Sequence, residues 1–495
     1  MKKSRHNLSN ERMLSCDIGQ LVPCAAIPVL PGDEFRANSK VMVRLSPMAA
    51  PVMHGISIRV HHFFVPDRLT WPDGHPSTFE DFITGGPDGN DASVTPKLNT
   101  TGTAYDLLDY MGLPVGGSQS GIPVMSTAVR AFNLIYNEWY RDQDLITERT
   151  LEDLTIPNVA YGRDYYNTAR PWPQKGEEVT LPLGDRAPVV GIGVTGQGAA
   201  SGPTTVYETD GTGGTTYEDY YDTTGSRPLV EADPDNVGFP GIFADLSQAT
   251  AATINALRRA SGLQRFAEAR ARWGSRYAEY TRHAFGAVPL DARIQRPEFL
   301  GGGTNRVSIS EVLQTAPEST GRDFGVGDMY GHGIGMAKSN RYKTRFQEHG
   351  MVISMFSVRP NPMYSNGIER HFLKNDREDF YQRELAHIGQ QEVLEQEVYA
   401  DSTNSGNVFG WNDRYAEYRH ARSMAVAEFR DVLDYWHLAR KFSTAPALNQ
   451  AFVEVTPADT KRIFNEQTNH SLWVFCDHQV QARRVVPKNA TARLL

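Results

Sequence analysis

At 495 residues the chain exceeds the roughly 250–300 residues at which one hydrophobic core stops growing, so it holds several domains or one domain with very large insertions. Its 40% apolar residues, 10% aromatic residues and 29 prolines are typical of a folded, loop-rich protein and exclude a disordered chain or a helical bundle. A formal charge of −8 excludes a molecule whose whole surface binds nucleic acid, because a net acidic surface repels a polyanion.

The cysteines and the apolar runs indicate the compartment. Cys16, Cys24 and Cys476 leave one thiol unpaired after any disulfide and lack the short paired spacing of a zinc site, so we expect three free thiols in a reducing compartment. No apolar run is long enough to span a bilayer, and the basic N-terminus is not followed by an apolar signal segment. We therefore expect no membrane insertion, no signal peptide and no cofactor.

The first predicted elements are strands at residues 41–45 and 56–65. Apolar and polar residues alternate from Ile56 to Val60, which indicates one buried and one exposed face. Pro66 ends the strand because it has no N–H to donate. His61 and His62 point to opposite faces of this strand, so both cannot bind one metal ion from that spacing alone.

Two later segments predict helices. Residues 128–146 form an amphipathic pattern in which Phe132, Ile135 and Trp139 share one face, and we expect these aromatics in the core. Residues 249–285 are mostly helical, with breaks at Gly262 and Gly274, and are rich in arginine. These arginines could contact nucleic acid, but we favour a solvated face or pairing across a subunit boundary.

Between these helices, residues 184–243 form an insertion. The segment is rich in Gly, Thr, Ala, Ser and Tyr, and its acids far outnumber its bases, so it should be hydrated and repel nucleic acid. Tyrosines are enriched in recognition surfaces because they bury a large area at a small entropic cost. Its recognition candidates are Tyr217, Tyr220 and Tyr221. The alternative is a solvated loop without a partner.

The C-terminal half predicts further strands and offers one misleading motif. Residues 331–339 read Gly-His-Gly-Ile-Gly-Met-Ala-Lys-Ser but lack the spacing of a Walker loop, so we expect a flexible turn before a strand at residues 351–358. A last strand at residues 472–480 precedes a basic tail.

Catalytic patterns are weak. There is no Gly-x-Ser-x-Gly elbow and no cysteine in an active-site context, so we predict that the protein is not an enzyme. The alternative is a β-sandwich carbohydrate-binding or glycoside-hydrolysing protein that uses two acids. Its weak candidate pairs are Glu378 with Asp379 and Glu80 with Asp81.

Several blocks carry a resemblance to a known family. They are residues 44–86, with His-His-Phe-Phe-Val-Pro-Asp-Arg-Leu; residues 132–142, Phe-Asn-Leu-Ile-Tyr-Asn-Glu-Trp-Tyr-Arg-Asp; residues 171–176, Pro-Trp-Pro-Gln-Lys-Gly; residues 286–303, with Asp-Ala-Arg-Ile-Gln-Arg-Pro-Glu and three glycines; and residues 409–419. At these spacings the chain resembles the major capsid protein of the Microviridae, the small single-stranded DNA phages, and in particular the gokushovirus-like branch.

The resemblance implies a mainly β fold, an eight-stranded antiparallel jelly roll of viral capsid type with long inserted loops and several helices, as one domain over residues 1–495. It also implies a T=1 icosahedral shell of sixty copies around circular single-stranded DNA, assembled in the host bacterial cytoplasm. In this family a large insertion protrudes from the virion, which we expect of residues 184–243, with a role in attachment to a host-cell receptor. DNA-pilot and small DNA-binding virion proteins are the further expected partners.

Basic residues gather at the two termini, and in a shell protein they would suit an inner face that meets phosphate. We predict basic arms at residues 1–12 and 478–495; the alternative is that short basic tails are merely solvated. The residues predicted to contact DNA are Arg483, Arg484, Lys488 and Arg493 first, and Lys2, Lys3 and Arg5 second. Residues 488–495 depart from the C-terminal ending associated with the family. The host, the receptor and any metal at subunit contacts stay open.

Overall fold

The computed structural model describes residues 3–177, 179, 254–274, 276–313, 329–404 and 406–488, together with four two-residue strands between residues 189 and 244. The chain divides into two compact units, residues 1–173 with 270–495, and residues 174–269. Apart from the four short strands, the insertion expected at residues 184–243 lies outside the described residues. Among the residues described, no helix is both long and apolar enough to cross a membrane.

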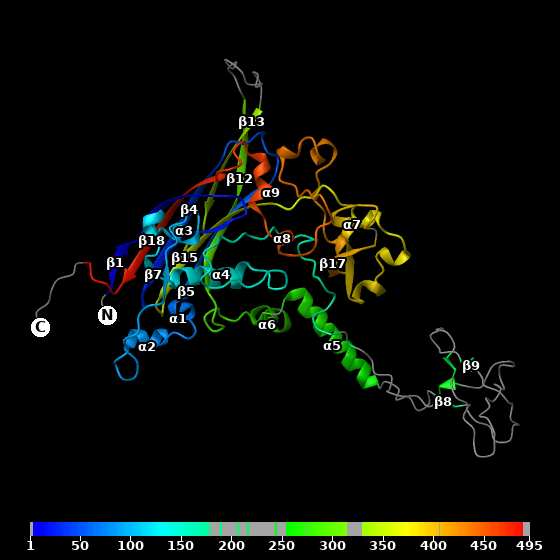
Figure 1. The fold of residues 1–495 in the computed structure, drawn as a ribbon, viewed down its shortest axis with the longest axis horizontal. Coiled ribbons are helices and arrows are strands. Elements are labelled where there is room, and N and C mark those ends of the chain that lie inside the picture. The colour runs from blue at the N-terminus through cyan, green and yellow to red at the C-terminus, as the bar shows by residue number, and fades with distance from the viewer. Residues whose placement is uncertain are drawn as a thin grey trace, which may run out of the picture. The chain divides into compact units, whose positions relative to one another are not determined.

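One antiparallel sheet dominates the first unit, so the protein is mainly β, as predicted (Figure 1). Within the described residues, eight strands follow one another across it, and all their pairings are antiparallel. In spatial order they are β1 (Ser4–Asn7), β18 (Leu472–Arg484), β4 (Glu34–Leu45), β13 (Met329–Lys338), β12 (Glu298–Leu313), β5 (Ile56–Pro66), β15 (Gly350–Pro360) and β3 (Leu21–Val29). Two more strands, β2 (Asn10–Cys16) and β14 (Tyr342–Arg345), pair with β18 and β4.

The largest core cluster lies on the inner face of this sheet. Along β4, the buried Val41 and Val43 alternate with the exposed Lys40 and Arg44, as the two-residue period of a strand requires. Their buried side chains pack with inward residues of β3, β5, β15 and β18 into one apolar cluster. The strands predicted at residues 41–45, 56–65, 351–358 and 472–480 are confirmed as parts of β4, β5, β15 and β18.

Short helices pack against the other face of β5, β15 and β3. They are α3 (Leu107–Met111), α4 (Thr127–Ile135) and the following single-turn π-helix η2 (Tyr136–Tyr140). Phe132 and Ile135 of α4 are fully buried in one apolar cluster with Phe63 and Ile353, which confirms the amphipathic helix. Its predicted end at residue 146 is wrong, because the helical segment stops at Tyr140. These helices leave the outer face of β18, β4 and β13 uncovered.

The arginine-rich helical region is also confirmed, with one correction. It forms α5 (Ile254–Trp273) and α6 (Tyr277–Phe285), and the chain breaks at Gly274, as predicted. The break predicted at Gly262 is wrong, because that residue lies inside α5. A single glycine costs a helix only about 1 kcal/mol, which its good helix-forming neighbours offset.

A second correction concerns residues 331–339, which were expected to be a turn. They form most of β13, which pairs with both β12 and β4. The remaining elements are shorter. They are α1 (Asp67–Thr70), α2 (Phe79–Thr84), β6 (Lys97–Asn99), β7 (Pro123–Met125), β16 (Gln390–Leu394), α7 (Glu395–Val398), β17 (Val408–Asp413), α8 (Gln450–Val453) and α9 (Pro457–Thr460).

Candidate nucleic-acid interface

The uncovered outer face of the sheet carries rows of basic side chains. Residues directly opposite each other in an antiparallel pair share a face. The strand register places Arg5 opposite Arg483, Arg483 opposite Glu34, and Glu34 opposite Arg345. One row across β1, β18, β4 and β14 therefore contains three arginines and one glutamate.

Further along the same face, β4 presents a basic residue at every second outward position. Arg36 lies opposite Lys343 of β14, and Lys40 lies opposite Lys338 of β13. These four side chains and Arg44 belong to exposed residues. We call this surface the basic face and define it by ten residues. They are Arg5, Arg36, Lys40, Arg44, Lys338, Arg341, Lys343, Arg345, Trp473 and Arg483.

Part of the basic face is hollowed. A depression of about 1110 Å³ lies over β1, β18, β4 and β14. Six basic side chains line it, against the two acids Glu34 and Asp477. Glu34 is already neutralised: Lys3 Nζ lies 2.8 Å from one of its carboxylate oxygens and Arg483 Nη1 lies 3.6 Å from the other. The hydrogen bond from Lys3 lowers the pKa of Glu34, so this carboxylate stays charged and paired. The depression is therefore net positive.

Apolar side chains continue the basic face at its far end. Trp473 of β18 lies opposite Arg44 and is 51% exposed. In the adjacent row Met336 of β13, 62% exposed, lies opposite Met42. A row of cations that ends at an exposed indole offers charges for phosphates and a flat surface on which a base can stack.

The structure brings together some of the predicted DNA-contacting residues. Arg5 and Arg483 lie opposite each other on the basic face, and Lys3 joins them through Glu34. Arg484 points elsewhere: its Nε lies 2.7 Å from the fully buried Asp33, and it also donates to the Pro28 carbonyl. Lys488 is exposed at the end of the described chain.

Other predicted residues lie outside the described part of the chain. They are Lys2, Arg493, Tyr217, Tyr220 and Tyr221. The two segments expected as basic arms are strands over most of their described length, because β1 and β2 both pair with β18.

Sequence reasoning missed the basic residues of β4 and β14. The signal was present, since Arg36, Lys40 and Arg44 recur every four residues and so share one face of a strand. The predicted strand began at residue 41, which hid this periodicity. For the arginines of the helical region we favoured a solvated face or pairing across a subunit boundary, but two of them pair within the chain: Arg272 lies 2.6 Å from Asp413, and Arg276 donates to the Asn137 carbonyl at 2.6 Å.

Comparison with known proteins now decides between the capsid and the carbohydrate-active alternatives. The family model described as capsid protein (F protein) matches residues 1–494. The chain belongs to this phage capsid protein family. It is therefore a structural protein of the virion shell and not an enzyme, as predicted, and the resemblance to the Microviridae is confirmed.

Three relatives of this capsid protein are each named capsid protein VP1. The one from Bdellovibrio phage phiMH2K is 32% identical over 91% of this chain and 88% of its own length. The one from Chlamydia phage 1 is 30% identical over 98% of this chain and 94% of its own. The one from Spiroplasma virus 4 is 27% identical over 91% and 87%. The likeness thus spans almost the whole capsid protein.

Proposed function

We propose that the chain is a jelly roll of viral capsid type and that sixty copies assemble into a T=1 icosahedral shell around circular single-stranded DNA. The family match over residues 1–494 carries this proposal. An antiparallel path of eight strands fits a jelly roll, and long loops provide the surface for contacts between copies. Three buried free thiols suit assembly in a reducing cytoplasm.

The size of the purified protein tests the shell. Light scattering and negative-stain microscopy of the full-length chain under assembly conditions should reveal uniform small icosahedral particles. A stable monomer under the same conditions would contradict the proposal.

The basic face is the proposed DNA-contacting surface. It combines exposed cations with an exposed tryptophan, and the packed helices leave it open. Contact through phosphates and stacking carries no sequence information, as a shell around a whole genome requires. We keep Arg5 and Arg483 as predicted DNA contacts. We exclude Arg484, because its guanidinium is paired with Asp33. The other residues predicted to contact DNA remain Lys2, Lys3, Lys488 and Arg493.

Removal of three charges tests the basic face. In the variant Arg36→Gln/Lys40→Gln/Lys343→Gln, binding of a labelled single-stranded oligonucleotide should weaken. The slope of log K against log salt should fall by about 2, because each phosphate contact to a single strand contributes about 0.7. The matched control, Arg377→Gln/Arg383→Gln/Arg430→Gln, removes three exposed charges away from the sheet. An equal loss of oligonucleotide affinity in both variants would contradict the proposal, because it would show that binding depends on the net charge of the protein and not on the basic face.

The insertion at residues 184–243 is the proposed protrusion for host attachment. Its acidic, tyrosine-bearing composition suits a hydrated recognition surface. Particles that lack residues 195–227 should keep their size but adsorb poorly to host cells. The finer variant Tyr217→Ser/Tyr220→Ser/Tyr221→Ser should show the same loss, and Tyr207→Ser serves as the control. Unchanged adsorption of intact particles would contradict attachment through this segment. DNA-pilot and small DNA-binding proteins remain proposed partners.

A further inference from the structure

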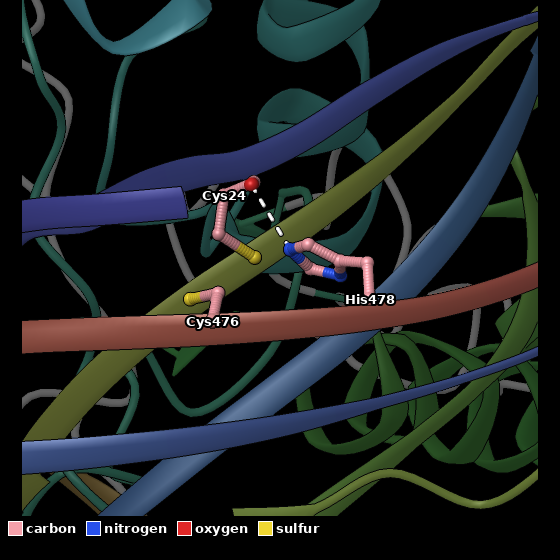
Figure 2. Close-up of side chains that lie close together, drawn as sticks. All are labelled: Cys24, Cys476 and His478. Atoms are coloured by element: carbon pink, nitrogen blue, oxygen red, sulfur yellow. Dashed lines mark hydrogen bonds between the residues drawn. The ribbon is translucent and has the colours of Figure 1, made fainter. Parts of the chain in front are cut away.

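Two thiols and one imidazole meet inside the core of the sheet (Figure 2). Cys24 comes from β3, and Cys476 and His478 come from β18. All three side chains are buried, and their potential ligand atoms lie within 4.8 Å of one another. No other group of three such side chains is found among the described residues.

The topology makes this meeting unusual. β18 and β3 lie near opposite ends of the strand path and are not neighbouring strands of the sheet, so the cluster joins the inner faces of distant strands. Cys24 sits at a β-bulge, because Ser354 pairs with Ala25 while Met355 pairs with Pro23. A bulge re-aims the side chain of its extra residue. At this bulge the thiol of Cys24 faces β18.

The imidazole is oriented by a hydrogen bond on its far side. His478 Nδ1 lies 2.7 Å from the hydroxyl of Ser39 on β4, and His478 Nε2 lies 3.1 Å from the Cys24 carbonyl oxygen. In Figure 2 the Nε2 edge of the ring is turned toward Cys24. The carbonyl oxygen can only accept, so in this arrangement Nε2–H donates to Cys24 and Nδ1 accepts from the Ser39 hydroxyl. A bound metal ion would require the other tautomer, in which Nδ1–H donates to Ser39 and the Nε2 lone pair faces the metal; the Ser39 hydroxyl can serve as either donor or acceptor and would hold the ring in both.

The charges of this donor set suit a divalent cation. Two thiolates, a neutral imidazole and a divalent cation sum to zero charge, which avoids the cost of burying a net charge.

The donor set selects the metal. Thiolate and imidazole are ligands of zinc, whereas calcium and magnesium prefer oxygen. Around one zinc ion, with bonds of about 2.3 Å to sulfur and 2.0 Å to nitrogen, ligand atoms lie roughly 3.5–4 Å apart. The observed limit of 4.8 Å requires only a small contraction. Backbone oxygens of Cys24 and Ser354, at 3.1 and 3.4 Å from His478 Nε2 and Cys24 Sγ, are at hand for a fourth position.

We propose that Cys24, Cys476 and His478 form a structural zinc site that ties β3 to β18. The site is not evident from the sequence, because Cys24 and Cys476 are 452 positions apart in the chain. A zinc ion here would link an early and a late part of the chain after both have joined the sheet.

Metal content and cobalt spectroscopy test the site. The full-length protein, purified under reducing conditions with zinc and dialysed against a weak chelator, should retain about one zinc ion per chain. Cobalt in place of zinc should produce the near-ultraviolet charge-transfer absorption of cobalt–thiolate bonds. Cys24→Ala and Cys476→Ala should abolish both signals. Cys16→Ala, which removes the third buried thiol of the same core, should leave them unchanged.

Two results would overturn the proposal. One is a metal-free wild-type protein without a cobalt–thiolate band under these conditions. The other is a Cys24–Cys476 disulfide, detected by mass spectrometry, in protein purified from the reducing cytoplasm. The cobalt spectrum of the unmodified protein decides the matter even where a cysteine variant fails to fold.

Discussion

At the residue scale, Glu397 is a buried carboxylate whose charge is paired with Arg370. It is fully buried, and Arg370 Nη1 lies 3.0 Å from one of its oxygens. Burial raises the pKa of Glu397 even with this arginine present. A buried charge without its partner is strongly destabilising.

Arg370→Met should therefore lower the free energy of unfolding by about 3–5 kcal/mol at neutral pH. The loss should shrink at lower pH, because the unpaired Glu397 can then take up a proton in the folded state. Urea unfolding at two pH values measures both effects. Arg377→Met, at an exposed position, is the control and should change stability by at most about 0.5 kcal/mol.

A second residue-scale prediction concerns acid. Burial, aided by the nearby Arg59 and Arg359, lowers the pKa of His61 to about 4. In the unfolded chain this histidine takes up a proton near pH 6.5, whereas in the folded protein it stays neutral at that pH. Stability should fall as pH drops from about 6.5 to about 4, by about 1 kcal/mol per pH unit from this residue.

His61→Gln should flatten this part of the plot of stability against pH, because glutamine does not titrate. The glutamine amide can still form a hydrogen bond with the Tyr140 hydroxyl, which lies 2.7 Å from His61 Nδ1. Denaturant unfolding across the pH range measures the slope. His387→Gln, at an exposed histidine, is the control. Equal slopes in wild type and His61→Gln would refute the assignment.

At the element scale, a triple glycine lies in the N-terminal half of β12, shortly before this strand changes partners. Its N-terminal half pairs with β5 up to Arg306, and its C-terminal half pairs with β13 from Val307. A methyl group on Gly303 would collide with the backbone carbonyl of Lys338. Gly302 and Gly303 let the neighbouring strands approach closely there.

Gly303→Ala should destabilise the subunit by at least about 2 kcal/mol, because rigid backbone would have to move. Gly117→Ala is the matched control, since a methyl group there meets no atom within 4 Å. Thermal unfolding of both variants measures the difference, and equal melting temperatures would contradict the close approach.

At the scale of the whole molecule, the end of α6 and the segment after it expose large apolar side chains. Phe285 is 71%, Val288 72% and Leu290 66% exposed. Such a cluster is what a shell protein would cover with a neighbouring copy.

Leu290→Asp should therefore block particle assembly and leave the circular dichroism of the subunit unchanged, whereas Leu290→Met should assemble normally. Sedimentation velocity separates particles from subunits. Normal particles from Leu290→Asp would place this segment outside the shell contacts.

The sequence alone determined individual secondary-structure elements and membership of the capsid family. Alternation at residues 56–60, the amphipathic pattern before Trp139 and the conspicuous blocks of the capsid family are readable along the chain, because strand and helix periods act over a few residues.

Only the tertiary structure decided which distant residues are neighbours. Gly331, Gly333 and Gly335 resemble a flexible loop in sequence, yet they line the inner side of β13, where Met48, Leu45 and Ile58 of neighbouring segments already fill the space. The basic face and the Cys24–Cys476–His478 cluster likewise exist only because strands far apart in the chain pair or face each other, and no local period encodes which strands those are.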